Sequence, residues 1–175
     1  MSEIAFSATL LEAELSRIVG LPLTCLWRAL GQIFEFGEQK PFINRNGEEA
    51  THAEVSLKFL ADWRVSLGAV TVFGSGDHAH GKRRFYDRKT PPRELFNRTR
   101  WKRAKEFLRR VTEETLLVES VKVTDTGVIF VKLSDGYEVV GLRCGTELDD
   151  LLYYSGKEDR SILVCESGML MPVDH

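Results

Sequence analysis

The sequence predicts an α+β fold, in which a mainly antiparallel β-sheet is covered by two principal helices at about residues 9–19 and 92–111. Apolar and polar residues alternate in several segments, which is typical of strands with one buried face. These strand-like segments follow one another in blocks instead of alternating with helices. Two other segments carry apolar stripes at helical spacing. The length of 175 residues fits a single domain over residues 1–175.

The first helix is expected from Thr9 to Val19. Thr9 and Glu12 fit a capping box, in which each side chain satisfies a backbone amide of the first turn. Gly20 closes the helix because glycine readily adopts the left-handed conformation that ends one. The predicted buried stripe consists of Leu11, Leu15 and Ile18.

Strands are expected in the first half of the chain on both sides of a polar turn. Residues 32–36 alternate polar and apolar, and Gly37 is expected to end that strand. Asn46-Gly47 is a turn signal. Residues 52–73 read as two or three antiparallel strands of a meander, with a turn at Gly68.

The second helix, at about 92–111, is expected to begin after Thr90, with Pro91 and Pro92 tolerated in the first turn. Its apolar stripe includes Trp101, Ala104, Leu108 and Val111, widened by Leu95, Phe96 and Phe107. Further strands are expected at 116–118, 121–123, 128–131 and 137–142, with Asp135-Gly136 as a hairpin turn. A short helix at 146–153 and a last strand at 162–165 complete the prediction.

Composition excludes several classes of protein. No apolar run approaches the roughly 18 residues that a membrane span needs, and the acidic N-terminus does not resemble a signal peptide. The three cysteines, Cys25, Cys144 and Cys165, show no C-x-x-C spacing, so neither a disulfide framework nor a zinc site is predicted. We therefore expect a cytoplasmic protein with no membrane partner.

The net charge of −2 conceals a strong segregation. Residues 82–110 form a basic loop-helix segment with a formal charge of +10, and the rest of the chain carries −12. Such a distribution steers charged partners. Arginine dominates the segment, and arginine binds phosphate or carboxylate bidentately and stacks on aromatic rings. The candidate basic binding face consists of Arg98, Arg100, Lys102, Arg103, Arg109 and Arg110.

Three interpretations of the basic segment stay open. It can bind nucleic acid, an acidic protein surface, or the acids of its own chain. The remaining charge of −12 would repel a nucleic-acid strand that extends past the segment, which makes nucleic acid the less favoured partner. The opposite candidate face, for a basic partner, consists of the acidic residues Glu147, Asp149, Asp150, Glu158 and Asp159.

The residues that could support catalysis are few. Asp77, His78 and His80 could ligate a metal in a small metal-dependent enzyme, although a polar surface loop is the more ordinary interpretation. The paired acids near the C-terminus are more typical of a solvated face than of acid–base chemistry. We expect no catalytic residue, no bound metal and no cofactor.

Several motifs resemble a family of small uncharacterised bacterial proteins. They are G-L-P-L at 20–23, W-R-A at 27–29, F-E-F-G at 34–37, W-R-V at 63–65 and G-S-G-D at 74–77. The resemblance covers about residues 10–80 and implies a small α+β protein, similar to the immunity proteins that neutralise a toxin from a neighbouring cell. The basic segment at 82–110 departs from the family pattern.

The sequence therefore leads to the hypothesis of a non-enzymatic binding protein, an immunity protein that occludes the active site of a cognate bacterial toxin. The alternatives are a nucleic-acid-binding protein that uses residues 82–110 and a small metal-dependent enzyme that uses Asp77, His78 and His80.

Overall fold

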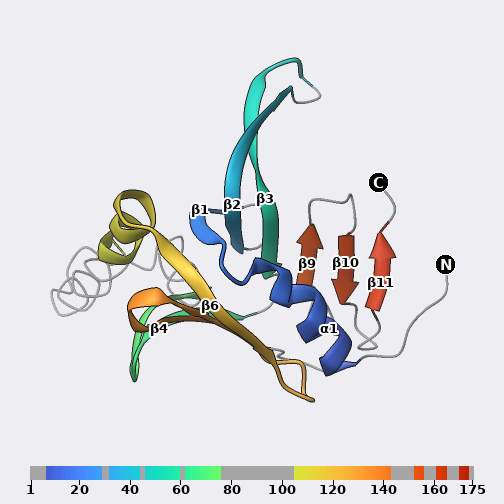
Figure 1. Cartoon of the computed structure of the whole chain (residues 1–175), viewed down its shortest axis with the longest axis vertical. Helices are drawn as coiled ribbons and strands as arrows, with labels where there is room; N and C mark the ends of the chain where they lie inside the picture. The colour runs from blue at the N-terminus through green and yellow to red at the C-terminus, as the bar shows by residue number, and fades with distance from the viewer. Residues whose placement is uncertain are drawn as a thin grey trace, which may run out of the picture.

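The computed structural model describes residues 7–28, 32–43, 46–59, 62–75, 105–142, 152–155, 161–164 and 170–173. The predicted fold class is confirmed, because the chain forms a mainly antiparallel, curled sheet with two helices packed on it (Figure 1). The strands are β1 (Pro22–Arg28), β2 (Gln32–Ile43), β3 (Glu49–Phe59), β4 (Trp63–Leu67), β5 (Val70–Gly74), β6 (Leu116–Val123), β7 (Ile129–Leu133), β8 (Tyr137–Gly141), β9 (Leu152–Ser155), β10 (Ser161–Val164) and β11 (Leu170–Val173).

The sheet consists of two halves, which we call wings: one is β11-β10-β9-β3-β2-β1 and the other is β6-β7-β8-β4-β5. A short pairing between β1 and β6, which we call the seam, joins the two wings. The strand order is β11-β10-β9-β3-β2-β1-β6-β7-β8-β4-β5, and the strands pair antiparallel. At the seam, β1 and β6 pair only through Pro22 with Leu117 and Leu23 with Leu116. This short pairing lets the wings turn toward each other and enclose a core.

The prediction of a meander over residues 52–73 is wrong in one respect. β3 and β4 are consecutive in the chain, but β3 pairs with β2 and β9, whereas β4 pairs with β5 and β8. Between Phe59 and Trp63 the chain crosses from one wing to the other. Both side chains are buried, and each packs its ring edge-to-face against Phe34, at 5.7 and 5.4 Å between centroids. The core therefore holds the two wings together at this crossing.

The first helix begins earlier than predicted. Helix α1 (Ala8–Leu15) is followed by a 3₁₀ turn, η1 (Ser16–Ile18), and the predicted stripe of Leu11, Leu15 and Ile18 is buried. The N-cap is Ser7, whose hydroxyl accepts a hydrogen bond from the Leu10 amide, so the capping box at Thr9 is wrong. Glu12 instead accepts a hydrogen bond from the Val123 amide at 2.7 Å, which ties α1 to β6.

The second helix is described over residues 105–113, while residues 92–104 of the prediction lie outside the described ranges. Phe107 and Val111 are buried, and the Phe107 ring packs 5.1 Å from that of Tyr137. Leu108 is 40% exposed, so its place in the predicted buried stripe is wrong. A stripe defined by spacing alone is wider than the face that a helix buries.

Most strands of the second half are confirmed. The predicted segments at 116–118 and 121–123 form one strand, β6, with an irregular register between Val118 and Ser120. Asp135 and Gly136 both have positive φ in the β7–β8 connection, as the hairpin signal predicts. β10 confirms the strand predicted at 162–165 as far as Val164.

The C-terminal end of the prediction needs two corrections. Leu152 and Tyr153 belong to β9, so the helix predicted at 146–153 is wrong there; residues 146–151 lie outside the described ranges. β11 is not among the predicted strands, and it contains Pro172, a residue that disfavours the interior of a sheet. β11 is at the edge of the sheet, where the missing amide of proline is tolerated.

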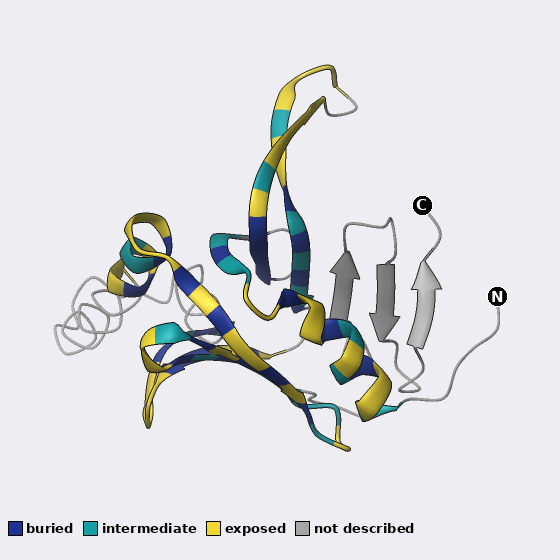
Figure 2. Cartoon of the chain, in the orientation of Figure 1, coloured by how far each residue is buried: buried dark blue, intermediate teal, exposed yellow. Residues whose placement is uncertain are grey.

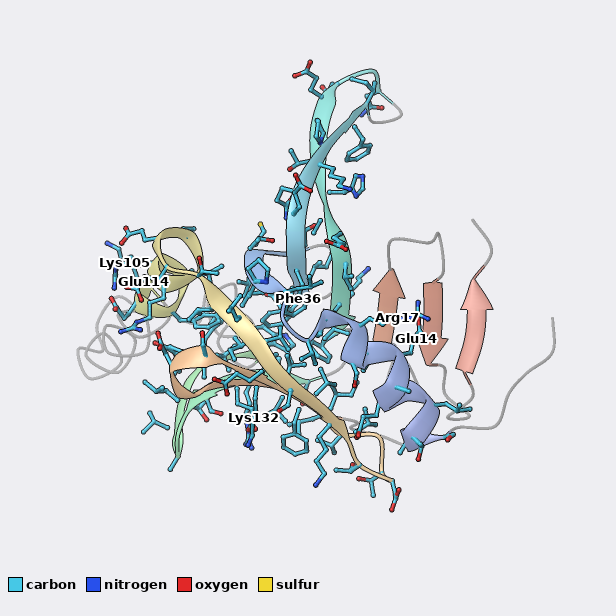
Figure 3. All side chains as sticks on the ribbon, in the orientation of Figure 1. Glu14, Arg17, Phe36, Lys105, Glu114 and Lys132 are labelled. Carbon is cyan, nitrogen blue, oxygen red and sulfur yellow. The ribbon has the colours of Figure 1, made fainter. Side chains whose placement is uncertain are left out.

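The core fills the space between the wings and beneath α1, as the buried segments in Figure 2 and the side chains in Figure 3 show. Phe34 and Phe36 of β2 are fully buried there. No helix in the described part of the chain is long and apolar enough to cross a membrane.

Candidate partner-binding surfaces

A two-stranded arm projects from the body of the molecule (Figures 1 and 2). We call residues 38–43 of β2 and 46–52 of β3 with its preceding turn the β2–β3 arm. In the described structure, residues 39–43 pair with residues 49–53 and with no other strand, because β1 pairs only with residues 32–36 and β9 only with 56–59. This isolation places the arm outside the packed sheet.

The arm leaves the body at a β-bulge. The register of β2 on β3 shifts between the Phe36–Val55 pair and the Gln39–Ala53 pair. Gly37 lies at the shift with a φ of +85°, a conformation that favours glycine. The prediction that Gly37 ends the strand is therefore wrong, since β2 continues to Ile43. The glycine bends the strand and so directs the arm.

Polar contacts tie the base of the arm to β1. Glu35 is only 5% exposed, and its Oε2 accepts a hydrogen bond from Gln39 Nε2 at 2.9 Å. The same nitrogen donates to Thr24 Oγ1 at 3.1 Å, and Thr24 Oγ1 donates to the Glu35 carbonyl at 3.1 Å. These bonds link β1, the bulge and the first residues of the arm in one network.

Apolar side chains are exposed at the tip of the arm. Pro41, Phe42 and Ile43 are consecutive and exposed, with Phe42 at 41% and Ile43 at 64%. The Phe42 ring packs edge-to-face on His52, with 5.4 Å between centroids. Ile43 pairs across the strands with Glu49. Three consecutive exposed apolar residues are unfavourable in water, which makes the tip a candidate contact surface.

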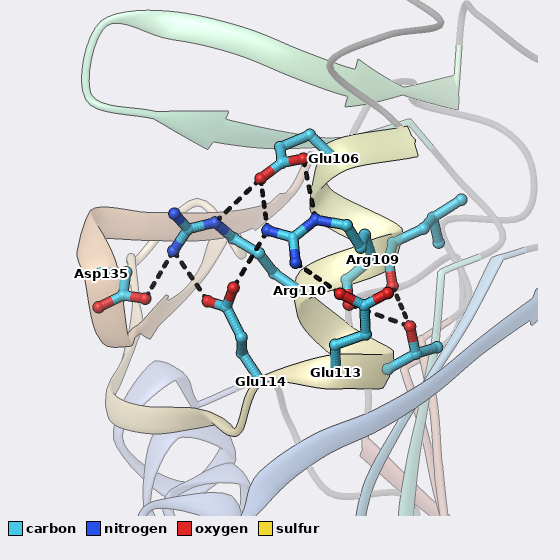
Figure 4. Close-up of polar contacts among 8 residues, drawn as sticks. Glu106, Arg109, Arg110, Glu113, Glu114 and Asp135 are labelled. Carbon is cyan, nitrogen blue, oxygen red and sulfur yellow. Dashed lines mark hydrogen bonds and ion pairs between the residues drawn. The ribbon is translucent and has the colours of Figure 1, made fainter.

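Arg109, a residue of the predicted basic face, is surrounded by acids (Figure 4). Its guanidinium pairs with Glu106 at 2.8 Å, with Glu113 at 2.6 Å and with Glu114 at 3.1 Å. Glu106 and Glu113 lie three and four residues from Arg109 along the helix, the spacing at which helical side chains are neighbours, and Glu114 lies five residues away at the end of the helix. They raise the pKa of Arg109 further above its ordinary value.

Arg110 joins the helix to the β7–β8 turn (Figure 4). It pairs with Asp135 at 2.8 Å, with Glu114 at 3.2 Å and with Glu106 at 3.5 Å. Its guanidinium also lies 6.0 Å from the centre of the Tyr137 ring. The contact with Asp135 connects two segments far apart in the sequence.

The ion pairs change how the basic segment at 82–110 is interpreted. Of its six candidate binding residues, the structure describes Arg109 and Arg110, and both pair with acids of their own chain. Glu113, Glu114 and Asp135 lie beyond residue 110, so a charge summed over 82–110 overstates the local positive field. For these two arginines, the interpretation of pairing within the chain is the one that the geometry supports.

We expect this cluster to make stability depend on acid pH. Hydrogen bonds from Arg109 lower the pKa of Glu106, so the ionised carboxylate favours the folded state. That contribution is present above the unfolded pKa of about 4.3 and is lost as the pH falls through the lower folded value. The Tm of the native protein should therefore exceed that of Glu106→Gln at pH 6, by a small margin because the site is exposed, and the gap should close near pH 3.

The matched control is Glu119→Gln, at an exposed acid of β6. It should show no comparable pH-dependent gap in Tm when both variants are followed by circular dichroism at low salt. A Glu106 gap that stays constant from pH 6 to pH 3 would contradict the assignment of this ion pair.

Cys25 does not have the environment of a nucleophile. Burial and the nearby Glu35 carboxylate raise the pKa of its thiol, which disfavours the reactive thiolate. Within the described residues, no group of three or more His, Cys, Asp and Glu is arranged to hold a metal ion.

The other predicted site residues lie outside the described ranges. These are the basic residues Arg98, Arg100, Lys102 and Arg103, the acidic residues Glu147, Asp149, Asp150, Glu158 and Asp159, and the metal candidates Asp77, His78 and His80. Their assignments stay predictions.

The β2–β3 arm is not among the candidate binding surfaces that the sequence predicts. The signal was present in the run Pro41-Phe42-Ile43 directly before the turn at Asn46-Gly47. Hairpin signals flanked by apolar residues are ordinarily read as buried sheet. Only the register, which shows that no third strand covers these residues, distinguishes an arm from a core hairpin.

Comparison with known proteins finds no family model, no curated protein and no solved structure that matches this chain.

Proposed function

We propose that this protein is a non-enzymatic binding protein, an immunity protein that neutralises a cognate bacterial toxin by occluding its active site. The observation that carries the proposal is the β2–β3 arm, whose tip exposes Phe42 and Ile43 away from the core. An exposed apolar tip on an open strand pair favours aggregation unless a partner covers it. A binding role gives that exposure a purpose.

The shape of the arm suits occlusion. Neighbouring strands lie about 4.8 Å apart, so a two-stranded ribbon is narrow enough to enter a cleft that a globular surface cannot. The polar network of Glu35, Gln39 and Thr24 holds the base of this ribbon in place. A preorganised element loses less conformational entropy on binding, which raises affinity.

The geometry of the two described arginines weighs against a role for them in binding nucleic acid. A nucleic-acid surface needs cationic groups that can exchange their counterions for phosphates. Arg109 and Arg110 are instead engaged by Glu106, Glu113, Glu114 and Asp135. Their ion pairs would have to break before either arginine could bind a phosphate.

Coexpression tests the proposal. The partner to use is the C-terminal domain of a secreted toxin encoded next to this gene. We expect the protein to rescue growth of cells that produce this domain, and the two proteins to elute as one complex at moderate salt. A toxin domain from an unrelated system is the control and should not be neutralised. Cell death despite expression, or separate elution of the two proteins, would overturn the proposal.

A further inference from the structure

The chemistry of the arm tip is specific enough to describe the surface that it fits. The tip places the apolar Ile43 on the same face as an acid of the facing strand, while Phe42, the preceding residue of β2, projects from the opposite face and packs on His52. Glu49 lies directly opposite Ile43 in the register, and Glu48 precedes it. In antiparallel strands, directly opposite residues share a face and have Cβ atoms about 5 Å apart. Ile43 and Glu49 therefore form one compact apolar-acidic unit.

The lysine of the described arm lies away from that unit, and Arg45 of the turn lies outside the described residues. Lys40 lies opposite His52 in the strand register, three positions before Ile43 and Glu49. On the exposed strand residues of the arm, the described acids Glu38 and Glu49 outnumber the described Lys40, and Glu49 is the one beside the apolar tip. A complementary site consequently offers an apolar pocket for Ile43 and a cation beside it for Glu49.

We infer that the tip of the β2–β3 arm enters an apolar cleft on the toxin, with Ile43 on one face of the ribbon and Phe42 on the other, and that a Lys or Arg side chain at the rim of this cleft pairs with Glu49. The inference rests on the proposed function and names its contact surface. Buried aromatic and aliphatic anchors dominate binding energy, while charges at the rim set the rate of association.

Two pairs of substitutions test the surface. Ile43→Thr keeps a β-branched residue in the strand but removes apolar contact. Val70→Thr likewise puts threonine in place of an exposed β-branched aliphatic residue, on β5, where Val70 is 45% exposed and Ile43 is 64% exposed. Glu49→Lys reverses the rim charge, and Glu119→Lys reverses an exposed acid on β6. All four positions are exposed, so the fold should tolerate the changes, and circular dichroism of each variant would check this.

Binding kinetics with the toxin domain supply the readout. We expect Ile43→Thr to weaken affinity about 10-fold or more, mainly through faster dissociation. Glu49→Lys should slow association about 10-fold at low salt and less at high salt, because salt screens the charge. Val70→Thr and Glu119→Lys should each stay within about 2-fold of the native protein.

The outcomes separate this inference from the proposed function. A complex that forms equally well with the Ile43→Thr and Glu49→Lys variants overturns the inference and leaves the function standing. Absence of any complex with the native protein overturns both. A native protein that sediments as a dimer without toxin, while Ile43→Thr sediments as a monomer, assigns the tip to a second copy of this chain and also overturns the inference.

Discussion

Replacing Gly141 with alanine is expected to destabilise the protein by about 3 kcal/mol, at the upper end of the cost of overpacking a core. Gly141 ends β8 and pairs with Trp63 of β4. A Cβ at this position would overlap the Phe59 ring. That ring is buried and held edge-to-face by Phe34, so it cannot rotate away without losing core contacts. The Tm should fall by roughly 6–12 °C, as measured by thermal denaturation.

A double-mutant cycle isolates the cause. Phe59→Leu alone should cost about 1 kcal/mol, because it exchanges one large apolar side chain for a smaller one. In the Gly141→Ala background, the smaller leucine makes room for the new methyl group. The double variant should then be more stable than the sum of the single effects predicts, by about 1–2 kcal/mol. Additive effects would contradict the steric explanation.

The crossing beside Gly141 also shows where sequence patterns stop being informative. In β4, Trp63 and Val65 are buried and Arg64 between them is exposed, as the alternation of side chains along a strand requires. Alternation says which face a residue occupies, but not which strand lies alongside. The separation of β3 from β4 depends on the contacts of Phe34 with Phe59 and with Trp63. Phe59 and Trp63 are close in sequence, whereas Phe34 is far from both, so the contacts do not follow from sequence separation. Local propensity cannot encode that choice.

The candidate sites show the same limit. Charge segregation is visible in the sequence, but the partners of Arg110 include Asp135, which is 25 residues away. Exposure of Phe42 and Ile43 follows from the absence of a third strand beside them in the described sheet, a property of the register and not of the residues themselves. The sequence predicts the fold class and most strands but does not predict the arm.

Replacing Gly37 with alanine is the second change with a large expected effect on stability, because Gly37 lies in the bulge at the base of the arm. Gly37 has a φ of +85°, which costs an alanine about 1–2 kcal/mol. An added Cβ would also lie 2.7 Å from Glu54 Cβ, an atom that cannot rotate away because it is attached directly to the backbone of β3. We expect a total loss of about 2–3 kcal/mol in the free energy of unfolding, measured in urea.

Gly47→Ala is a matched control for the backbone term. Gly47 has a φ of +79°, but nothing lies within 4 Å of the position where its Cβ would be. It should lose only the conformational term, so the difference between the two variants measures the contact with Glu54.

If the proposed function holds, Gly37→Ala should also weaken toxin binding even where the protein stays folded, because the bulge sets the direction of the arm. Equal losses of stability for the two variants would mean that β3 yields at Glu54. The bulge would then be too soft at the base to hold the arm in a fixed direction, and preorganisation could not account for its affinity.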